Sequence, residues 1–387
     1  MERDIVVRSV GLKSFVRKPG KAVRCVVTNR WKFRSLNLYL RPIDHRWDEL
    51  LFNGELMIEE ITTNLYKIEI PLPEIPLKSI NSYVIKTSGR NLIIDTGMNL
   101  KECMDVMQMS LKNLKVDLGK TDFFITHFHG DHFGLVPRLI KDESIIYINK
   151  LEADVIDKIR SGVATLEIES FARKSGFPEK DIGDIFPPRF RYELKESASI
   201  PLRFVDDENV LEIGDYRLKC VKTPGHSKGH ICLYESSKKI LFSGDHLLND
   251  ITPGIQARLD NENPLREYLL SLDKVYQLDV ELVLPGHRGI FRDCKKRIKE
   301  LQDHHQERSD EVLAILKEGS KNVYQVASRM TWSIIDCDTW DDSPSMQKFF
   351  ATGEAAAHLE YLEDKGCVRK ETKDQQIVYS LNVNPKY

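Results

Sequence analysis

The stretch FFITHFHGDHFGL, residues 123–135, places three histidines and an aspartate within six positions behind an apolar run. His127 and His129 stand two apart on a segment that leaves a predicted strand, so their side chains can point to the same side. A glycine then lets the chain bend before Asp131 and His132. Imidazole and carboxylate are ligands that Zn²⁺ prefers and that Mn²⁺ and Fe²⁺ accept. The stretch therefore predicts a metal-binding loop, and a metal-free surface cluster of histidines is the alternative.

Strand-like segments precede this loop. The runs NLYKIEIPL (64–72), SINSYVIKTSG (79–89) and RNLIIDTGMN (90–99) alternate or are continuously apolar, and the last one turns at Asp95. A helix is expected next, because apolar residues recur there at helical spacing: Cys103, Met107, Leu111 and Leu114. The loop at 127–132 then follows the carboxyl end of the next strand, where α/β proteins place ligand sites.

Further metal ligands are expected downstream, because one loop cannot complete the coordination of two ions. Three apolar runs end beside a glycine and a residue that can bind metal. YRLKCVKTPGH presents His226, KKILFSGDH presents Asp245, and VELVLPGHRG presents His287. The glycine in each turn frees the backbone to direct the side chain into a shared site. The sequence thus predicts that ligands from four segments converge.

The motifs THFHGDH, TPGHSKGH, FSGDH and LPGH, with the earlier LIIDTG, resemble the five ordered motifs of the metallo-β-lactamase-fold hydrolases. The resemblance covers residues 60 to 290 or so and implies an α/β protein, an αββα sandwich with a dinuclear site along one edge of two sheets. It implies two ligand groups and one bridging residue. The first group is His127, His129 and His226, the second is Asp131, His132 and His287, and Asp245 bridges them. Asp95 would orient ligands by hydrogen bonds without touching metal.

The resemblance also implies the chemistry, which is hydrolysis dependent on two divalent metal ions. Zn²⁺ is the favoured ion, with Fe²⁺ or Mn²⁺ as alternatives. Two cations that share a water lower its pKa enough to give a bridging hydroxide near neutral pH. Asp131 is the predicted catalytic residue, because its carboxylate can orient that hydroxide and accept or return a proton. This mechanism requires no serine or cysteine nucleophile.

Two further histidines, His230 and His246, each follow a predicted ligand closely. We expect them to hydrogen-bond a ligand or to fill a polar position in the fold. Donation of a proton to the leaving group is the alternative role.

Differences from individual branches of the family narrow the reaction. Flavodiiron-type relatives carry glutamate where this chain has His129, which disfavours electron-transfer chemistry. Acyl-homoserine lactonases carry a tyrosine three residues after the bridging aspartate, where this chain has Leu248. Persulfide dioxygenases share the HxHxDH pattern but use a single iron, and the ligand set does not exclude that binding mode, although they lack a C-terminal module like the one predicted below. The favoured hypothesis for the substrate is an ester or thioester of a small, acyl-bearing molecule.

A helical insertion is predicted at about 150–195. The 93 residues between His132 and His226 exceed what a minimal two-layer fold needs. LEADVIDKIRSGVATLEIESFARKSGF has the pattern of helices, and aromatic residues follow it: Phe186, Phe190 and Tyr192. One interpretation is an aromatic lid over the metals that would suit an apolar acyl group. The other is that the aromatic residues only pack the added helices.

Residues 55–292 thus form the predicted hydrolase domain, and 293–387 a second domain. RIKELQDHHQERSDEVLAILKEG predicts a helix with Ser309 as a cap, two further helices follow, and GCVRKETKDQQIVYSL predicts a hairpin. Three helices and a hairpin resemble a winged helix. The segment is similar to the C-terminal module in the branch of the superfamily that includes β-lactamase-like protein 2, some members of which are endoribonucleases.

Charge argues against nucleic-acid binding by this second domain. Residues 295–387 carry 14 Lys and Arg against 16 Asp and Glu, whereas phosphate binding needs the opposite balance. A structural role is expected instead, either as a cap on the hydrolase domain or as a homodimer contact.

The N-terminal extension, residues 1–54, keeps a nuclease function open. Residues 1–46 carry 12 Lys and Arg against 3 Asp and Glu, which suits either a phosphate-binding arm or a loosely packed terminus. Two alternatives to the small-molecule hydrolase therefore remain. One is a metal-dependent endoribonuclease acting on single-stranded RNA, and the other is an inactive fold used as an interaction protein.

Composition sets the remaining expectations. A chain of 387 residues with 41% hydrophobic and 30% charged residues can bury at least one large core. It contains no apolar run of membrane-spanning length and no apolar secretory signal near its start, so a cytoplasmic location is expected. The seven cysteines show no CxxC pair, which predicts ordinary reduced thiols.

Overall fold

A computed structural model describes five segments of the chain, which are residues 57–73, 77–185, 202–257, 263–332 and 339–382. The predicted N-terminal extension lies outside these residues. So do the aromatic positions Phe186, Phe190 and Tyr192 of the predicted insertion. No helix among the described residues is both long and apolar enough to cross a membrane.

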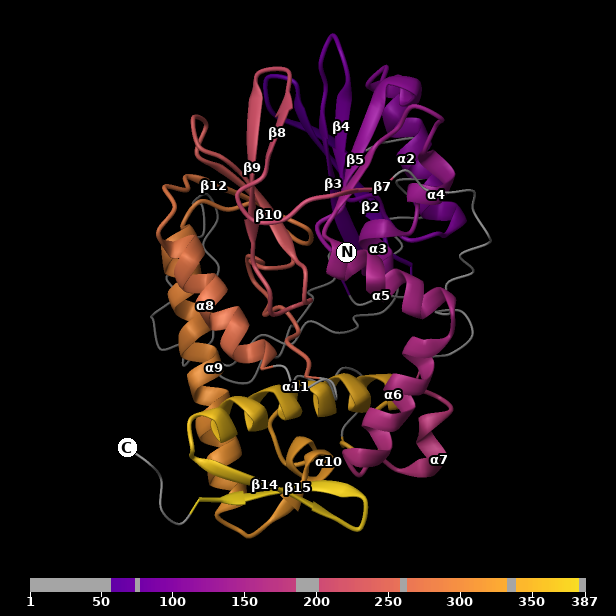
Figure 1. Ribbon diagram of the computed structural model, residues 1–387. Helices are drawn as coiled ribbons and strands as arrows, with labels where there is room; N and C mark the ends of the chain where they lie inside the picture. The colour runs from indigo at the N-terminus through magenta and orange to yellow at the C-terminus, as the bar shows by residue number, and fades with distance from the viewer. Residues whose placement is uncertain (1–56, 74–76, 186–201, 258–262, 333–338, 383–387) are drawn as a thin grey trace, which may run out of the picture. The chain divides into compact units, whose positions relative to one another are not determined.

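The first sheet contains seven strands in chain order. They are β1 (Ile58–Thr62), β2 (Leu65–Pro71), β3 (Ser79–Ile85), β4 (Asn91–Ile94), β5 (Thr121–Phe124), β6 (Ile146–Ile148) and β7 (Leu202–Phe204). Figure 1 labels β2, β3, β4, β5 and β7 of this sheet. Strands β1 to β4 pair antiparallel, and β4 to β7 pair parallel. The strands predicted within 64–72, 79–89 and 90–99 are confirmed as β2, β3 and β4.

The second sheet has five strands in the order β12, β11, β10, β9, β8. Their bounds are β8 (Val210–Ile213), β9 (Tyr216–Lys222), β10 (Ile231–Glu235), β11 (Ile240–Gly244) and β12 (Leu282–Pro285). All neighbours pair antiparallel except β11 and β12, which are parallel. Strands β9, β11 and β12 are the runs predicted to deliver His226, Asp245 and His287.

The central strands of the two sheets, such as β4, β10 and β11, are buried on both faces, which explains their nearly continuous apolar sequences. Along β4, Ile94 faces the second sheet and shares a core with Phe242, whereas Ile93 faces the opposite way. There it packs in a core with α2 (Lys101–Asn113). On the outer face of the second sheet, Val283 shares a core with α8 (Pro264–Tyr276). Helices thus cover the outer face of each sheet, and the predicted αββα sandwich is confirmed.

Shorter helices connect these strands. They are η1 (Leu118–Lys120), α3 (Gly130–Phe133), α4 (Val136–Leu139), α5 (Lys150–Arg160), α6 (Val163–Lys174) and α7 (Glu179–Ile182). The cysteines Cys103, Cys220, Cys232, Cys294 and Cys367 are free thiols, as expected, and the other two lie outside the described residues.

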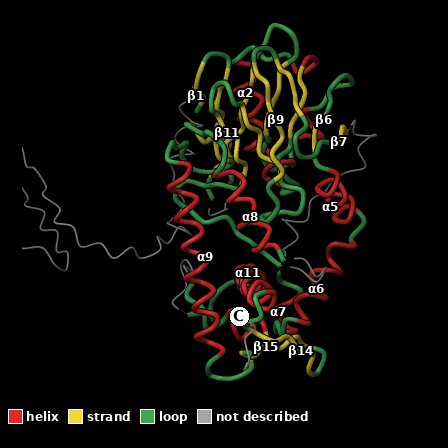
Figure 2. Tube along the Cα trace, turned by 60° about the vertical axis from the view of Figure 1, so that its left-hand side comes forward, coloured by secondary structure: helices red, strands yellow, loops and turns green. Residues whose placement is uncertain are grey.

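The C-terminal part adds helices and a third, three-stranded sheet. Its elements are α9 (Cys294–Leu316), β13 (Lys321–Asn322), α10 (Val323–Ala327), α11 (Ser345–Asp364), β14 (Val368–Lys373) and β15 (Gln376–Leu381). Figures 1 and 2 show α9 running from the second sheet toward these strands, and its apolar residues join a core shared with both. The predicted helices and hairpin are present, and they are compatible with an extra domain. The winged-helix assignment itself stays a prediction.

One expectation for α9 is wrong, because Ser309 is not a helix cap. It lies inside the helix, where its hydroxyl donates a hydrogen bond to the carbonyl oxygen of His305 at 2.8 Å. A serine can satisfy its hydroxyl in this way in mid-helix, so its presence alone does not mark a helix start.

The described part of the insertion packs against the C-terminal helices. Phe171 of α6 and the nearby Phe177 contact the ring of Phe349 edge to face, and Phe177 also contacts Tyr324. The backbone N–H of Tyr324 donates to the carbonyl oxygen of Ser175 at 2.9 Å. These two aromatic residues therefore serve packing, whereas a lid formed by residues 186–192 stays a prediction.

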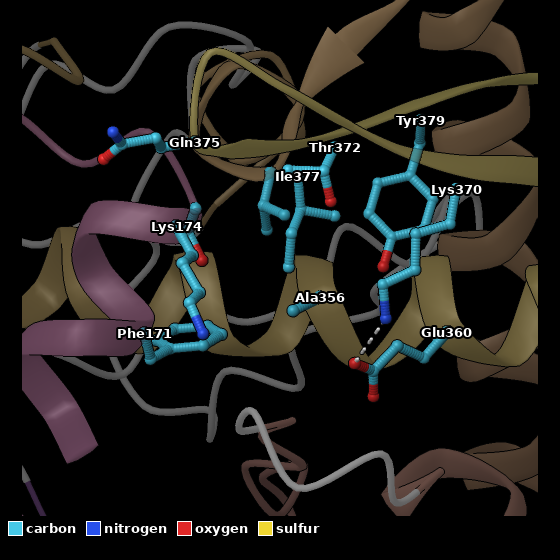
Figure 3. A pocket seen from close by; sticks show the side chains of 11 residues that line it. Phe171, Lys174, Ala356, Glu360, Lys370, Thr372, Gln375, Ile377 and Tyr379 are labelled. Atoms are coloured by element: carbon cyan, nitrogen blue, oxygen red, sulfur yellow. Dashed lines mark ion pairs between the residues drawn. The ribbon is translucent and has the colours of Figure 1, made fainter.

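A cavity of about 220 Å³ remains at this contact, between α6, α11 and the hairpin of β14 and β15 (Figure 3). On one side of it, Lys370 Nζ lies 3.8 Å from Glu360 Oε1. The insertion and the C-terminal helices thus share an apolar core and also line a partly charged cavity.

A buried histidine pair joins α9 to α11. His358 is 1% exposed, with Nδ1 at 3.0 Å from Ser309 Oγ and Nε2 at 3.5 Å from His305 Nδ1. Burial, reinforced by the charges of Arg308 and His304, lowers the pKa of His358 to about 3. Below about pH 6.5, His358 therefore binds a proton in the unfolded chain but stays neutral in the folded protein until the pH is much lower.

We expect the free energy of unfolding to fall as the pH falls from about 6.5 toward 4. Linkage gives up to about 1.4 kcal/mol per pH unit for His358, because the unfolded state binds more protons across that range. The variant His358→Gln should lose this share of the pH dependence, which urea titrations at several pH values will measure. A slope identical to that of the wild type would contradict the assignment.

Candidate metal centre

The ends of five strands deliver the predicted site residues to one place. Strand β4 leads to Asp95, β5 to the loop at 127–132, β9 to His226, β11 to Asp245 and β12 to His287. Within each of three groups drawn from these side chains, the ligand-capable atoms lie within 4.8 Å of one another. The groups are His127, His129 and His226; His127, His132 and Asp245; and Asp131, His132 and His287.

The first group consists of three imidazoles. His129 Nδ1 lies 2.9 Å from His127 Nε2 and 3.1 Å from His226 Nε2. Burial lowers the pKa of all three residues, and for His129 burial together with the charge of His226 lowers it to about 3. The rings are therefore neutral near pH 7, which is the form that binds a metal ion.

Asp131, His132 and His287, called the second group from here on, combine a carboxylate with two imidazoles. Asp131 Oδ2 lies 3.2 Å from His287 Nε2 and 3.9 Å from His132 Nε2. Burial alone would lower the pKa of both histidines, but nearby carboxylates outweigh it and raise the pKa of each. The negatively charged carboxylate of Asp131 thus lies close to the Nε2 atoms of both histidines.

Asp245 lies between the first group, which consists of three histidines, and the second group. Its Oδ1 is 3.6 Å from His132 Nε2, and its Oδ2 is 3.6 Å from His226 Nε2 and 3.5 Å from His287 Nε2. Burial would raise the pKa of Asp245, but the charges of His287 and His132 outweigh burial and lower it. The carboxylate is thus ionised and faces ligand atoms of both groups.

Three buried ligand atoms have no hydrogen-bond partner among the described residues: His132 Nε2, Asp245 Oδ1 and His287 Nε2. A buried polar atom without a partner costs about 1–3 kcal/mol, and native structures usually satisfy such atoms. All three atoms belong to the groups described above, so a cation at their centre would satisfy them together. The donor set therefore fits divalent metal.

The other ring nitrogens are held by outer partners. His132 Nδ1 lies 2.8 Å from Asp95 Oδ2, and the same carboxylate accepts hydrogen bonds from the backbone N–H and hydroxyl of Thr126. His226 Nδ1 lies 2.8 Å from the carbonyl oxygen of Gly254, and His287 Nδ1 lies 2.7 Å from that of Ser79. Such contacts fix which nitrogen of each ring faces inward. Asp95 thus lies within hydrogen-bond distance of a predicted ligand, and its orienting role stays a prediction.

His230 and His246 lie differently. His230 Nε2 accepts a hydrogen bond from the backbone N–H of Asp245 at 3.2 Å, and its Nδ1 lies 2.8 Å from Thr223 Oγ1. His230 thus fixes the backbone that presents a predicted ligand. Neither ring nitrogen of His246 has a hydrogen-bond partner among the described residues, and its ring packs against Tyr268. The ring contact with Tyr268 therefore does not support the hydrogen-bonding role expected for His246, and that role stays a prediction.

The turn before His226 requires glycine. Gly225 has a φ of +144°, and a Cβ added there would lie 2.5 Å from Tyr268 Cβ. Tyr268 is fully buried and donates its hydroxyl to the carbonyl oxygen of His246 at 3.0 Å, so it cannot easily move away. One buried tyrosine therefore packs against two of the loops that carry predicted ligands.

We expect Gly225→Ala to lower the free energy of unfolding by about 1–3 kcal/mol, because the added methyl group overpacks this contact. It should also weaken zinc binding, since the turn that directs His226 must shift. Gly183→Ala is the matched control, because no atom lies within 4 Å of the Cβ position there. Thermal unfolding and zinc content per chain will test both variants, and equal behaviour of the two would contradict the prediction.

The same loop spells GHSKG across residues 225–229, the pattern of a serine-hydrolase nucleophile elbow. The context does not match, because the loop connects strand β9 to strand β10 and no helix follows it. Ser227 donates its hydroxyl to Glu152 Oε1 at 2.9 Å. This serine is a buried hydrogen-bond donor and not an exposed nucleophile.

Sequence reasoning missed Glu152, which lies in the first turn of α5 and is fully buried beside two ligand loops. No motif marks a single glutamate in an amphipathic helix, so no signal in one sequence could have found it. The carbonyl oxygens of Ser79 and Gly254 were missed because a backbone atom leaves no mark on residue identity.

Comparison with known proteins agrees with the fold. Residues 75–287 match the model of the metallo-beta-lactamase superfamily, and the chain belongs to that superfamily. Over 83% of its length, the chain is similar to a metallo-beta-lactamase family protein from Thermus thermophilus. That likeness covers 99% of the solved chain, with a TM-score of 0.69 and 26% identity.

Two curated relatives are also similar to this chain in sequence. A beta-lactamase-like protein 2 homolog of Caenorhabditis elegans is 25% identical over 62% of this chain and 67% of its own length. An atrochrysone carboxyl ACP thioesterase of Aspergillus novofumigatus is 22% identical over 68% of this chain and 66% of its own length. The match thus spans about two thirds of each of these relatives.

Proposed function

We propose that this protein is a metal-dependent hydrolase that acts on an ester or thioester of a small, acyl-bearing substrate. One observation carries the proposal, which is the convergence of ligand-capable side chains from four loops around buried ligand atoms without partners among the described residues. Membership of the metallo-beta-lactamase superfamily supports hydrolysis. The similarity to a protein named an acyl carrier protein thioesterase supports a thioester substrate.

The two ligand groups would hold two divalent ions. His127, His129 and His226 would bind one ion; Asp131, His132 and His287 would bind the other; and Asp245 would lie between them. When bound, such ions supply Lewis acidity that lowers the pKa of a water and polarises a carbonyl oxygen. The set of imidazoles and carboxylates favours Zn²⁺, with Fe²⁺ or Mn²⁺ as alternatives.

Asp131 would move the proton during the reaction. Its side chain is 17% exposed, whereas that of Asp245 is 8% exposed, so it is the more accessible of the two carboxylates. The charges of His132 and His287 outweigh burial and lower the pKa of Asp131, so its carboxylate is ionised. That carboxylate would take the proton of the attacking water and return it to the leaving group.

A small substrate is favoured over RNA by charge. The segment 295–387 carries more acidic than basic residues, and helix α11 carries Glu354, Glu360 and Glu363. A nucleic-acid surface needs clustered Lys and Arg. The superfamily membership that supports hydrolysis does not itself select the substrate.

Parallel assays on acyl thioesters, lactones and single-stranded RNA will test the proposal with metal-loaded wild type and Asp131→Ala. Thioester hydrolysis that the substitution abolishes would support it. RNA cleavage that the substitution abolishes, without thioester hydrolysis, would replace the proposed substrate class with a ribonuclease. Absence of all three activities in the metal-loaded protein would favour an interaction protein.

A further inference from the structure

Glu152 is a buried carboxylate that joins two separate loops of the metal centre. It is 0% exposed and lies on α5, at the start of the insertion. Its Oε2 accepts a hydrogen bond from the backbone N–H of Phe128 at 2.8 Å. Its Oε1 accepts from the backbone N–H of Gly229 at 2.5 Å and from the hydroxyl of Ser227 at 2.9 Å. Each carboxylate oxygen of Glu152 therefore accepts hydrogen bonds from a different loop, Oε2 from the loop of Phe128 and Oε1 from the loop of Ser227 and Gly229.

The donors flank the residues of the first ligand group. Phe128 stands between His127 and His129, and Ser227 directly follows His226. The rings of His129 and His226 reach toward each other across the gap between the loops, with Nδ1 and Nε2 at 3.1 Å. The hydrogen bonds of Glu152 thus fix the separation of the two segments that supply these three imidazoles.

The backbone approaches Glu152 too closely for the contact to be incidental. A Cβ added at Gly229 would lie 2.4 Å from Asn149 Oδ1 and 3.0 Å from Glu152 Oε1. Asn149 is itself fixed, because it caps α5 at Leu151 and donates to the carbonyl oxygen of Val205 at 3.0 Å. The start of the insertion therefore forms a rigid support for both loops.

We propose that Glu152 is a positioning residue that holds the two loops at the separation that one metal ion requires. Through it, the insertion sets the affinity of the first ligand group for metal. The inference rests on the proposed metal centre. It is specific to His127, His129 and His226, because the hydrogen bonds of Glu152 among the described residues go only to the two loops that carry them.

The variant Glu152→Gln tests this role. It keeps the size of the side chain but replaces one acceptor oxygen with an amide group, which cannot accept from a backbone N–H. Loss of a partner that orients ligands typically weakens metal binding by about 10- to 100-fold. Competition with a chromophoric zinc chelator will measure the affinity for zinc.

Asp122→Asn is the matched control. Asp122 is a buried carboxylate on β5 that accepts hydrogen bonds from Arg90 and from the backbone N–H of Ile145, and not from the ligand loops. We expect this variant to lower the melting temperature while its zinc affinity stays that of the wild type. A merely structural role for Glu152 predicts that both variants behave alike.

Double variants locate the effect. In a His287→Ala background, which leaves the first group intact, Glu152→Gln should weaken binding of the remaining ion by about 10- to 100-fold. In a His226→Ala background it should change zinc affinity little, because the first group is already broken. Equal effects in the two backgrounds, or none in either, would overturn the inference alone. A wild-type protein that binds no zinc would instead overturn the proposed metal centre.

Discussion

Replacing Asp131 with alanine is expected to lower kcat for thioester hydrolysis by about 10²- to 10⁴-fold, the range that a positioned acid or base contributes. The carboxylate is the proposed proton acceptor, and its Oδ2 lies 3.2 Å from His287 Nε2. Its removal therefore takes away both the base and one ligand of the second group. Steady-state kinetics on the metal-loaded protein will measure the effect.

The conservative variant Asp131→Asn separates these two contributions. An amide oxygen can still face a cation but is far too weak a base to accept the proton. Zinc content near that of the wild type with kcat as low as in Asp131→Ala would support the proton-transfer role. Retention of full activity in either variant would contradict it.

Asp245→Ala is expected to have the largest effect on metal content. Asp245 lies within 3.6 Å of ligand nitrogens in both groups, so its loss removes the one negative charge that they share. We expect zinc content to fall below one ion per chain and hydrolysis to fall at least as far as in Asp131→Ala.

The thermal stability of the metal-free protein is the control for Asp245→Ala, because it shows what the substitution does apart from its effect on metal binding. The carboxylate contributes to the raised pKa of His132 and His287, and without it two buried histidines lose a charge partner. We therefore expect the variant to unfold at lower temperature even after treatment with a chelator. Two zinc ions per chain in a well-folded Asp245→Ala protein would be inconsistent with a bridging position.

The strands and the ligand loops could be predicted from sequence because each loop has a local signature. An apolar run that ends in glycine beside histidine or aspartate indicates both a strand end and a directed side chain, as at His226 and His287. The resemblance to a known family then supplied the grouping of the ligands. The structure brings all the predicted ligand residues together.

Long-range contacts left no such signature. Glu152 gains its role only because α5 lies against two loops that are distant in sequence. Serine favours helix caps, so the sequence predicts a cap at Ser309, yet a hydrogen bond to the carbonyl of the preceding turn satisfies its hydroxyl inside α9. Phe171 and Phe177 carry no sign in the sequence that their partners are C-terminal residues.

The most direct test of the central claim is anomalous X-ray diffraction at the zinc absorption edge from crystals of the zinc-loaded protein. We predict two peaks, one among His127, His129 and His226 and one among Asp131, His132 and His287, with Asp245 beside both. A zinc-loaded crystal with no peak among these side chains, or with its only peak elsewhere, would contradict the account.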